Sequence, residues 1–357
     1  MKKMRIIIVA LWLALAVFAW VRPADALSAS ERRPLAQFPE LSGETIFGGS
    51  FMADFEDYTL DQFPLRDAFR TLKANIQLKV FGQKDNNNIY VADGYAAKLE
   101  YPYDADSIAR AVSRFQYVYD NYLQNCNVFL TVVPDKGYYL AEKHGYPLMD
   151  YETMFADLKT GMPWAEYIDL TDTLSLDSYY RTDTHWRQEA ILPAADKIAY
   201  ALGVTTGDFK AQHQDTAFYG VYCGQSALDL DPDGICLMEA DWMENCRVFN
   251  AESNGWGGIY DLSKLEGQDP YEVYLSGPRS LMTIENPNAE SNRELIIFRD
   301  SFGSSIAPLL AKDYAKVTLV DIRYLNPALL NNFIEFGGQD VLFLYSTLVL
   351  NNSETIK

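Results

Sequence analysis

Only three histidines occur in the 357-residue chain, and one of them, His185, has neighbours that could support catalysis. Asp183 precedes it by two residues in the stretch "TDTHW". A carboxylate so placed can hold the proton on one imidazole nitrogen and leave the other nitrogen free to accept a proton from a nucleophile. The pattern predicts a general base with its orienting carboxylate. The alternative is an ordinary loop histidine at the start of a helix.

A serine that could use this base follows an apolar run much later, in "ELIIFRDSFGSS". A buried strand is predicted to end at Asp300 and Ser301, and a helix to begin with Gly303 in its first turn. Ligands collect at the carboxyl ends of parallel strands, and the N–H groups of a helix N-terminus can hold a developing oxyanion. Gly303 would let a substrate approach closely. The alternative is that Ser301 only caps the helix.

Five short apolar runs predict the sheet that must position these residues. Each run is continuous rather than alternating, which is typical of strands covered on both faces. They span residues 128–133, 167–170, 295–298, 317–320 and 341–345. Helices are expected between them, one capped by Ser107 and one running from Ile191 to Leu202 and ending at Gly203. We therefore expect an α/β fold with a parallel sheet in three layers.

The N-terminal residues predict export. Three basic residues lie ahead of an uncharged apolar run of 16 residues from Ile6 to Val21, and "ADA" follows at positions 24–26. Residues 1–26 are thus expected to be a signal peptide or an uncleaved N-terminal membrane anchor, with the body of the chain outside the cytoplasm.

The remaining chain divides by composition. Residues 27–83 are expected to form an N-terminal extension with a helix near 65–80, and residues 84–357 the main domain. Turn-rich sequence from about 204 to 292 predicts an inserted β-rich subdomain.

Composition excludes some classes of function. The net charge is −19, with 49 acidic and 30 basic residues and no basic cluster after the first residues, so a nucleic-acid partner is not expected. In an exported chain, the closely spaced Cys223, Cys236 and Cys246 predict a disulfide among them, the alternative being buried thiols.

Neither a metal nor a cofactor is expected. The cysteines lack the spacing of a structural zinc site. The stretch "DLDPDG" begins like a calcium loop at Asp229, but Ala240 replaces the final glutamate, so it predicts a tight acidic turn.

Taken together, "TDTHW" and "FRDSFG" resemble the DHHW protein family and, more widely, the SGNH-hydrolase-like domain of the alginate O-acetyltransferases AlgJ and AlgX. The resemblance runs from about residue 90 to the C-terminus. It implies that Ser301 is the acyl-carrying nucleophile, His185 the base and Asp183 the orienting group. Two positions depart from the pattern. Thr184 replaces a histidine of the family name, which should leave the triad unaffected, and Arg299 replaces the usual glycine and is expected to narrow or recharge the entrance.

Two further side chains are candidates for substrate contact. Arg323 follows the run at 317–320, so it should lie on the same sheet edge as Ser301 and could bind an anionic sugar or support the acyl oxygen. The alternative is a solvent-facing arginine paired with Asp321. Trp186 could stack on a sugar face or pack under the following helix.

The resemblance implies an exported O-acetyltransferase that acts on a cell-envelope or secreted polysaccharide through an acetyl-serine intermediate. A membrane-bound O-acyltransferase would be the partner that supplies the acetyl group. Two alternatives remain open. The same triad could serve a carbohydrate acetyl esterase, or the fold could belong to a non-catalytic glycan-binding or assembly protein.

Overall fold

The computed structural model describes residues 2–357, which form two compact units. Residues up to 89 together with 221–230 form the N-terminal unit, and residues 90–220 together with 231–357 form the larger unit. Met1, the first residue of the predicted signal segment 1–26, lies outside the described residues.

The N-terminal unit begins with α1 (Lys2–Val21), which is long and apolar enough to cross a membrane. The 19-residue segment Lys3–Val21 has a mean hydropathy of 2.4. A signal sequence has the same length and composition, so α1 is consistent with either a signal or an anchor. The other elements of the unit are β1 (Leu27–Ser28), β2 (Arg33–Pro34), α2 (Gly43–Gly48), α3 (Ser50–Asp61), α4 (Arg66–Asn75) with a π-helical continuation (Ile76–Val80), and α9 (Val221–Ser226).

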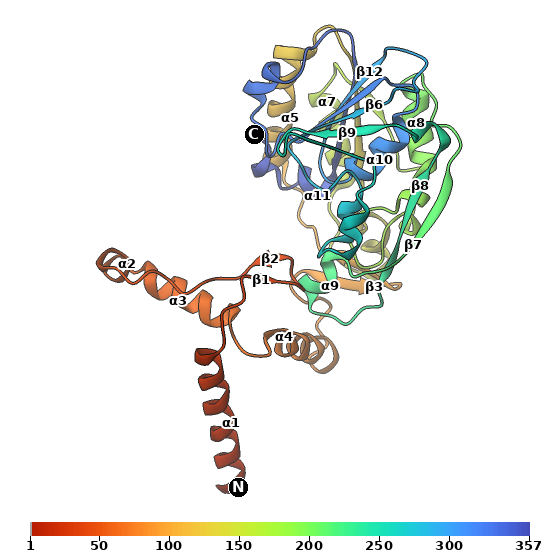
Figure 1. Cartoon of the computed structure of the whole chain (residues 1–357). Coiled ribbons are helices and arrows are strands. Elements are labelled where there is room, and N and C mark those ends of the chain that lie inside the picture. Colours follow the sequence, from red (N-terminus) through yellow and green to blue (C-terminus); the bar gives the residue numbers. More distant parts are fainter. Residues whose placement is uncertain (1) are drawn as a thin grey trace. The chain divides into compact units, whose positions relative to one another are not determined.

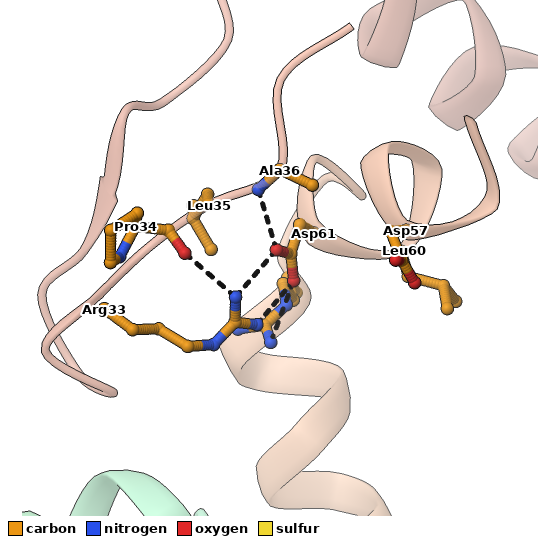
Figure 2. Close-up of a pocket in the computed structure, with 8 residues that line it drawn as sticks. Arg33, Pro34, Leu35, Ala36, Asp57, Leu60 and Asp61 are labelled. Carbon is orange, nitrogen blue, oxygen red and sulfur yellow. Dashed lines mark hydrogen bonds and ion pairs between the residues drawn. The ribbon is translucent and has the colours of Figure 1, made fainter. Parts of the chain in front are cut away.

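An ion pair ties β2 to the end of α3. Arg33 donates from Nη2 and Nη1 to the two carboxylate oxygens of Asp61 at 2.6 and 2.8 Å, and the N–H of Ala36 donates to the same carboxylate at 2.9 Å. Figure 2 shows these groups in the pocket that they line. The hydrogen bond from Arg33 lowers the pKa of Asp61 to about 2.

We expect this pair to make the stability of the N-terminal unit depend on pH. Because the pKa of Asp61 is lower in the folded chain than in the unfolded chain, the stabilisation is present above roughly pH 4 and is lost as the pH falls toward about 2. Asp61→Asn should therefore lower the unfolding temperature near neutral pH, and the difference from the wild type should shrink in acid. Scanning calorimetry would measure it, with the exposed Asp57→Asn as the control. A difference that does not change with pH would contradict the assignment.

The larger unit contains an eight-stranded sheet with the strand order β10-β9-β11-β13-β12-β14-β5-β6. All five predicted strands are present, and they lie next to one another in parallel. They are β5 (Asn127–Val133), β6 (Glu166–Ile168), β12 (Glu294–Arg299), β13 (Lys316–Val320) and β14 (Asp340–Ser346).

The turn-rich region 204–292 contributes to two sheets. Three of its strands extend the central sheet in antiparallel order through the pairing of β11 with β13, namely β9 (Arg247–Asn250), β10 (Gly255–Gly257) and β11 (Leu281–Glu285). The other two, β7 (Lys210–Phe218) and β8 (Asp233–Glu239), pair only with each other. A further two-stranded sheet, β3 (Ile89–Ala92) with β4 (Tyr95–Lys98), precedes the central sheet in the sequence.

Helices cover both faces of the central sheet. On one face lie α5 (Ala105–Val118) and α7 (Tyr151–Gly161), and on the other lie α8 (Leu192–Ala201) and α10 (Gly303–Leu310) (Figure 1). Neighbouring strand residues alternate between the two cores: Ile297 packs on the side of α8 and α10, and Phe298 on the side of α5 and α7. The predicted three-layer α/β fold is confirmed. The short helices α6 (Gly137–Leu140) and α11 (Thr347–Leu350) follow β5 and β14.

Two local predictions are wrong. Asp104 rather than Ser107 caps α5, because the Asp104 carboxylate accepts the N–H of Ser107 at 2.9 Å, while the Ser107 hydroxyl donates to a carbonyl elsewhere. The expected disulfide is absent from the described chain, since Cys236 and Cys246 are free thiols. Burial raises the pKa of both thiols to about 11, so they stay protonated at neutral pH.

Candidate active site

Asp183 and His185 lie in a tight loop whose ends meet. An isolated β-bridge joins Tyr179 to Trp186, and the N–H of Tyr180 donates to the carbonyl of His185 at 3.0 Å. One oxygen of Asp183, Oδ1, lies 3.1 Å from the backbone nitrogen of His185 and 2.6 Å from its Nδ1. The two-residue spacing therefore lets a single carboxylate oxygen fix both the backbone and the ring. A proton held on Nδ1 leaves Nε2 as the basic nitrogen.

Ser301 meets that nitrogen at the carboxyl end of β12. Its Oγ lies 2.7 Å from Nε2 of His185, although the two residues are 116 positions apart in the sequence. Ser301 is partly exposed, whereas Asp183 and His185 are only 2% and 9% exposed. The structure thus brings the three predicted residues together as a carboxylate, an imidazole and a hydroxyl in a hydrogen-bonded row that reaches the surface only at the serine.

Asp300 fixes the turn that presents Ser301. Its fully buried carboxylate accepts the N–H of Phe302 at 3.0 Å and the N–H of Ser346, at the end of β14, at 2.8 Å. The N–H of Gly303 donates to the carbonyl of Asp300, and the N–H of Ser304 donates to the carbonyl of Ser301. None of the hydrogen bonds described for residues 2–357 uses the N–H of Ser301 itself.

Arg299 and Gly303 lie on the two sides of Ser301 in the sequence and pack against each other. Arg299 is fully buried, and a Cβ on Gly303 would lie only 2.7 Å from its Cβ and 2.9 Å from its Cγ. Arg299 therefore does not narrow the entrance, and the close approach that Gly303 permits is to Arg299 rather than to a substrate. Burial lowers the pKa of Arg299, and its Nε and Nη2 find no hydrogen-bond partner among residues 2–357.

Trp186 does not fit the substrate-contact hypothesis, whereas Arg323 is paired with an acidic residue and keeps part of its side chain exposed. Trp186 is fully buried, with Nε1 donating to Ser305 Oγ at 2.8 Å and its ring edge-on to Phe302, so it packs beside α10 and cannot stack on a sugar. Arg323 is mostly buried and binds Asp321 through Nε at 2.9 Å and Nη2 at 2.6 Å. Arg323 is thus paired with Asp321, as the alternative predicted, but only 15% of its side chain is exposed.

Tyr271 is a site residue that the sequence did not reveal. Its ring stacks on the imidazole of His185 with a centroid distance of 3.9 Å and an interplanar angle of 7°. Its hydroxyl lies 2.9 Å from Ser305 Oγ, the same atom that accepts from Trp186. Burial raises the pKa of Tyr271, so its phenol is neutral. A tyrosine in a turn-rich segment, one of 24 in the chain, carries no sequence signal that marks it for this position.

We expect the Tyr271 ring to limit rotation of the His185 imidazole. Tyr271→Leu should slow acylation of Ser301 by an activated ester roughly 10- to 100-fold, because the base loses its productive orientation. Tyr271→Phe keeps the stacked ring, so it should react at nearly the wild-type rate while losing about 1 kcal/mol of stability with the hydrogen bond to Ser305. Stopped-flow acylation and thermal unfolding measure the two effects. Equal acylation rates for the leucine variant and the wild type would show that Tyr271 does not orient His185.

Residues 170–320 match the model of the DHHW protein family. This segment contains Asp183, His185 and Ser301. The predicted resemblance to DHHW proteins is confirmed. No curated protein matches the chain in sequence.

Solved structures agree with the family match at the level of the fold. A DHHW family protein from Eubacterium siraeum has a TM-score of 0.63 and 22% identity, covering 76% of this chain and 95% of its own. PatB1 from Bacillus cereus, solved with a sulfonyl adduct, has a TM-score of 0.57 and 18% identity, covering 73% and 95%. The O-acetyltransferase domain of AlgJ from Pseudomonas putida has a TM-score of 0.46 and 14% identity, covering 74% and 92%. The first two similarities show that this chain shares the fold of a DHHW protein and of PatB1.

Within residues 2–357, no group of three or more histidine, cysteine, aspartate or glutamate side chains is placed to hold a metal ion.

Proposed function

We propose that the protein is an exported O-acetyltransferase that moves an acetyl group onto a cell-envelope or secreted polysaccharide through an acetyl-Ser301 intermediate. The observation that supports this most directly is the 2.7 Å distance from His185 Nε2 to Ser301 Oγ, with Asp183 Oδ1 2.6 Å from the other ring nitrogen. A carboxylate, an imidazole and a hydroxyl in this order activate serine toward the carbonyl carbon of an acyl group.

In the first half-reaction, Ser301 Oγ bonds to the carbonyl carbon of the acetyl donor while Nε2 of His185 takes the hydroxyl proton. Asp183 stabilises the imidazolium that forms. The bond to the leaving group then breaks, and the leaving group departs with the proton from Nε2. The products are acetyl-Ser301, the deacylated donor and a neutral His185.

In the second half-reaction, a sugar hydroxyl attacks the acetyl carbon of acetyl-Ser301, and Nε2 of His185 takes its proton. The ester bond to Ser301 breaks and Oγ receives that proton, which regenerates the enzyme. The negative oxygen of each tetrahedral intermediate would accept a hydrogen bond from the N–H of Ser301, near the N-terminus of α10.

The donor and the cellular location follow from the same proposal. A membrane-bound O-acyltransferase would supply the acetyl group, and α1, whether it serves as a signal or as an anchor, would direct the rest of the chain out of the cytoplasm. Arg323, on the sheet edge that follows β13, is the proposed contact for an anionic part of the sugar, since 15% of its side chain remains exposed. No nucleic acid and no cofactor enter this scheme.

An acetyl esterase is the second candidate, because water can replace the sugar hydroxyl in the same second half-reaction. The glycan-binding alternative has less support, since it predicts a serine held away from the histidine rather than one at 2.7 Å.

The intermediate can be tested directly by intact-protein mass spectrometry after exposure to an activated acetyl ester. We expect the wild type to gain one acetyl group at Ser301, and Ser301→Ala and His185→Ala to gain none there. His144→Ala is the matched control, because it removes a histidine that lies 3.1 Å from a different carboxylate, Asp93. An unlabelled wild-type protein that is demonstrably folded would refute the acyl-enzyme and favour the glycan-binding alternative.

The direction of acetyl flow needs a second measurement. Incubation of the full chain with an acetyl donor and an unacetylated glycan should yield acetylated glycan with the wild type but not with Ser301→Ala. Release of acetate without any transfer to the glycan would instead identify an esterase, because water would then be the acceptor.

A further inference from the structure

Two buried charged side chains that the proposed chemistry does not use hold the loop that carries Asp183 and His185. The first is Lys136, which lies just beyond β5 and is 2% exposed. Its Nζ donates to the carbonyl of Tyr180 at 2.9 Å and to the carbonyl of Arg181 at 3.2 Å. A buried ammonium group thus binds two backbone carbonyls in the segment that leads into Asp183.

The second charged group is Asp233, at the start of β8, which is 8% exposed. Its Oδ1 accepts the N–H of Arg181 at 2.9 Å, and its Oδ2 accepts the N–H and the hydroxyl of Thr182 at 2.8 and 2.6 Å. Asp233 belongs to the "DLDPDG" stretch that begins like a calcium loop. Both of its oxygens are instead bonded to the loop before Asp183, which explains why this acidic residue is buried in an otherwise exposed turn.

Gly220, in the connection between β7 and α9, contacts the same peptide. Its N–H donates to the hydroxyl of Thr182 at 2.9 Å. A Cβ at position 220 would lie 2.3 Å from the carbonyl carbon of Thr182 and 2.4 Å from the nitrogen of Asp183. Any side chain at this position would displace the peptide bond that joins Thr182 to Asp183, so only glycine permits the contact.

We infer that Lys136, Asp233 and Gly220 form a positioning clamp for the peptide that leads into Asp183, and through it for the carboxylate that orients His185. The inference rests on the proposed function, because a clamp matters for catalysis only if His185 is the base. None of the three residues touches a reacting atom, so they are positioning residues.

Charge is the physical reason to assign this role. Hydrogen bonds to ionised groups are roughly twice as strong as neutral ones, and here they come from opposite charges on the two sides of the same backbone segment. A displacement of about 1 Å at a catalytic group can slow a reaction roughly 100-fold. Buried charges bonded to this segment can therefore keep the carboxylate of Asp183 within reach of the His185 ring during turnover.

The first test does not depend on catalysis. In the full chain with 15N-labelled histidine, the proton on Nδ1 of His185 should give a far-downfield NMR resonance because of its short hydrogen bond to Asp183, and His185→Ala identifies it by its loss. We expect the resonance to move upfield or broaden beyond detection in Asp233→Asn and in Lys136→Met. It should be unchanged in Asp231→Asn, which removes an exposed carboxylate from the same turn. An unchanged resonance in folded Asp233→Asn would overturn the clamp.

The second test separates positioning from mere stability. Acylation of Ser301 by an activated ester should slow roughly 10- to 100-fold in Asp233→Asn, and the same substitution should cause no further loss in an Asp183→Ala background, which lacks the carboxylate that the clamp positions. A purely structural role would instead lower the folded fraction, and hence the rate, by the same factor in both backgrounds, which would overturn the inference. Should Asp233→Asn not fold, Lys136→Met provides the same comparison from the carbonyl side.

The two tests also distinguish failure of the inference from failure of the proposed function. If Ser301 of the wild type is never acylated, the proposed function fails, while the resonance still reports whether the clamp holds Asp183 against His185. If Ser301 is acylated and neither the resonance nor the rate responds to Asp233→Asn, only the clamp fails.

Discussion

A hydrogen bond of 2.7 Å between His185 and Ser301 is the constraint on which the arrangement of this protein depends. The two residues come from segments 116 positions apart, and a bond of this length tolerates little relative movement of the segments. The serine is fixed by a strand in the interior of the parallel part of the central sheet, since β12 pairs with β13 on one side and with β14 on the other. The histidine lies on a loop, and loops need additional contacts to reach the same precision.

Those contacts come from side chains that have no proposed part in the reaction. Trp186, next to His185, donates to Ser305 on α10, and Tyr271 both stacks on the imidazole and bonds to the same serine. The helix that follows Ser301 is thus bound to Trp186, the residue that follows His185. Because Ser301 and Ser305 are joined through one turn of backbone, movement of α10 would shift both partners of the hydrogen bond between His185 and Ser301 together.

The sequence predicted the features that depend on local pattern and residue type. Parallel strands buried on both faces appear as continuous apolar runs, so all five were found, and the triad residues were recognisable because few side chains can perform their chemistry. The antiparallel strands β9 to β11 were recognised only as part of a turn-rich region, because their pairing with β13 is a long-range property.

Side-chain environment was harder to predict than side-chain chemistry. Trp186 follows His185 directly and Arg299 precedes Ser301 by two positions, yet both side chains are fully buried, because side-chain direction at the end of a strand or in a turn depends on packing that the sequence does not display. Asp233 was discounted as a metal ligand, and its actual partners are peptide groups some 50 positions earlier. The stacked Tyr271 has no local signature of any kind.

The contact between Asp300 and Ser346 has a consequence for when the site can exist. The Asp300 carboxylate that shapes the Ser301 turn accepts the N–H of Ser346, which lies 46 positions later, at the end of the strand beside β12. A chain in which β14 has not yet paired with β12 lacks this hydrogen bond, so its Ser301 turn is not held in the shape described above. The geometry of the Ser301 turn is therefore coupled to the pairing of β14 with β12, and the turn forms only when this part of the central sheet is complete.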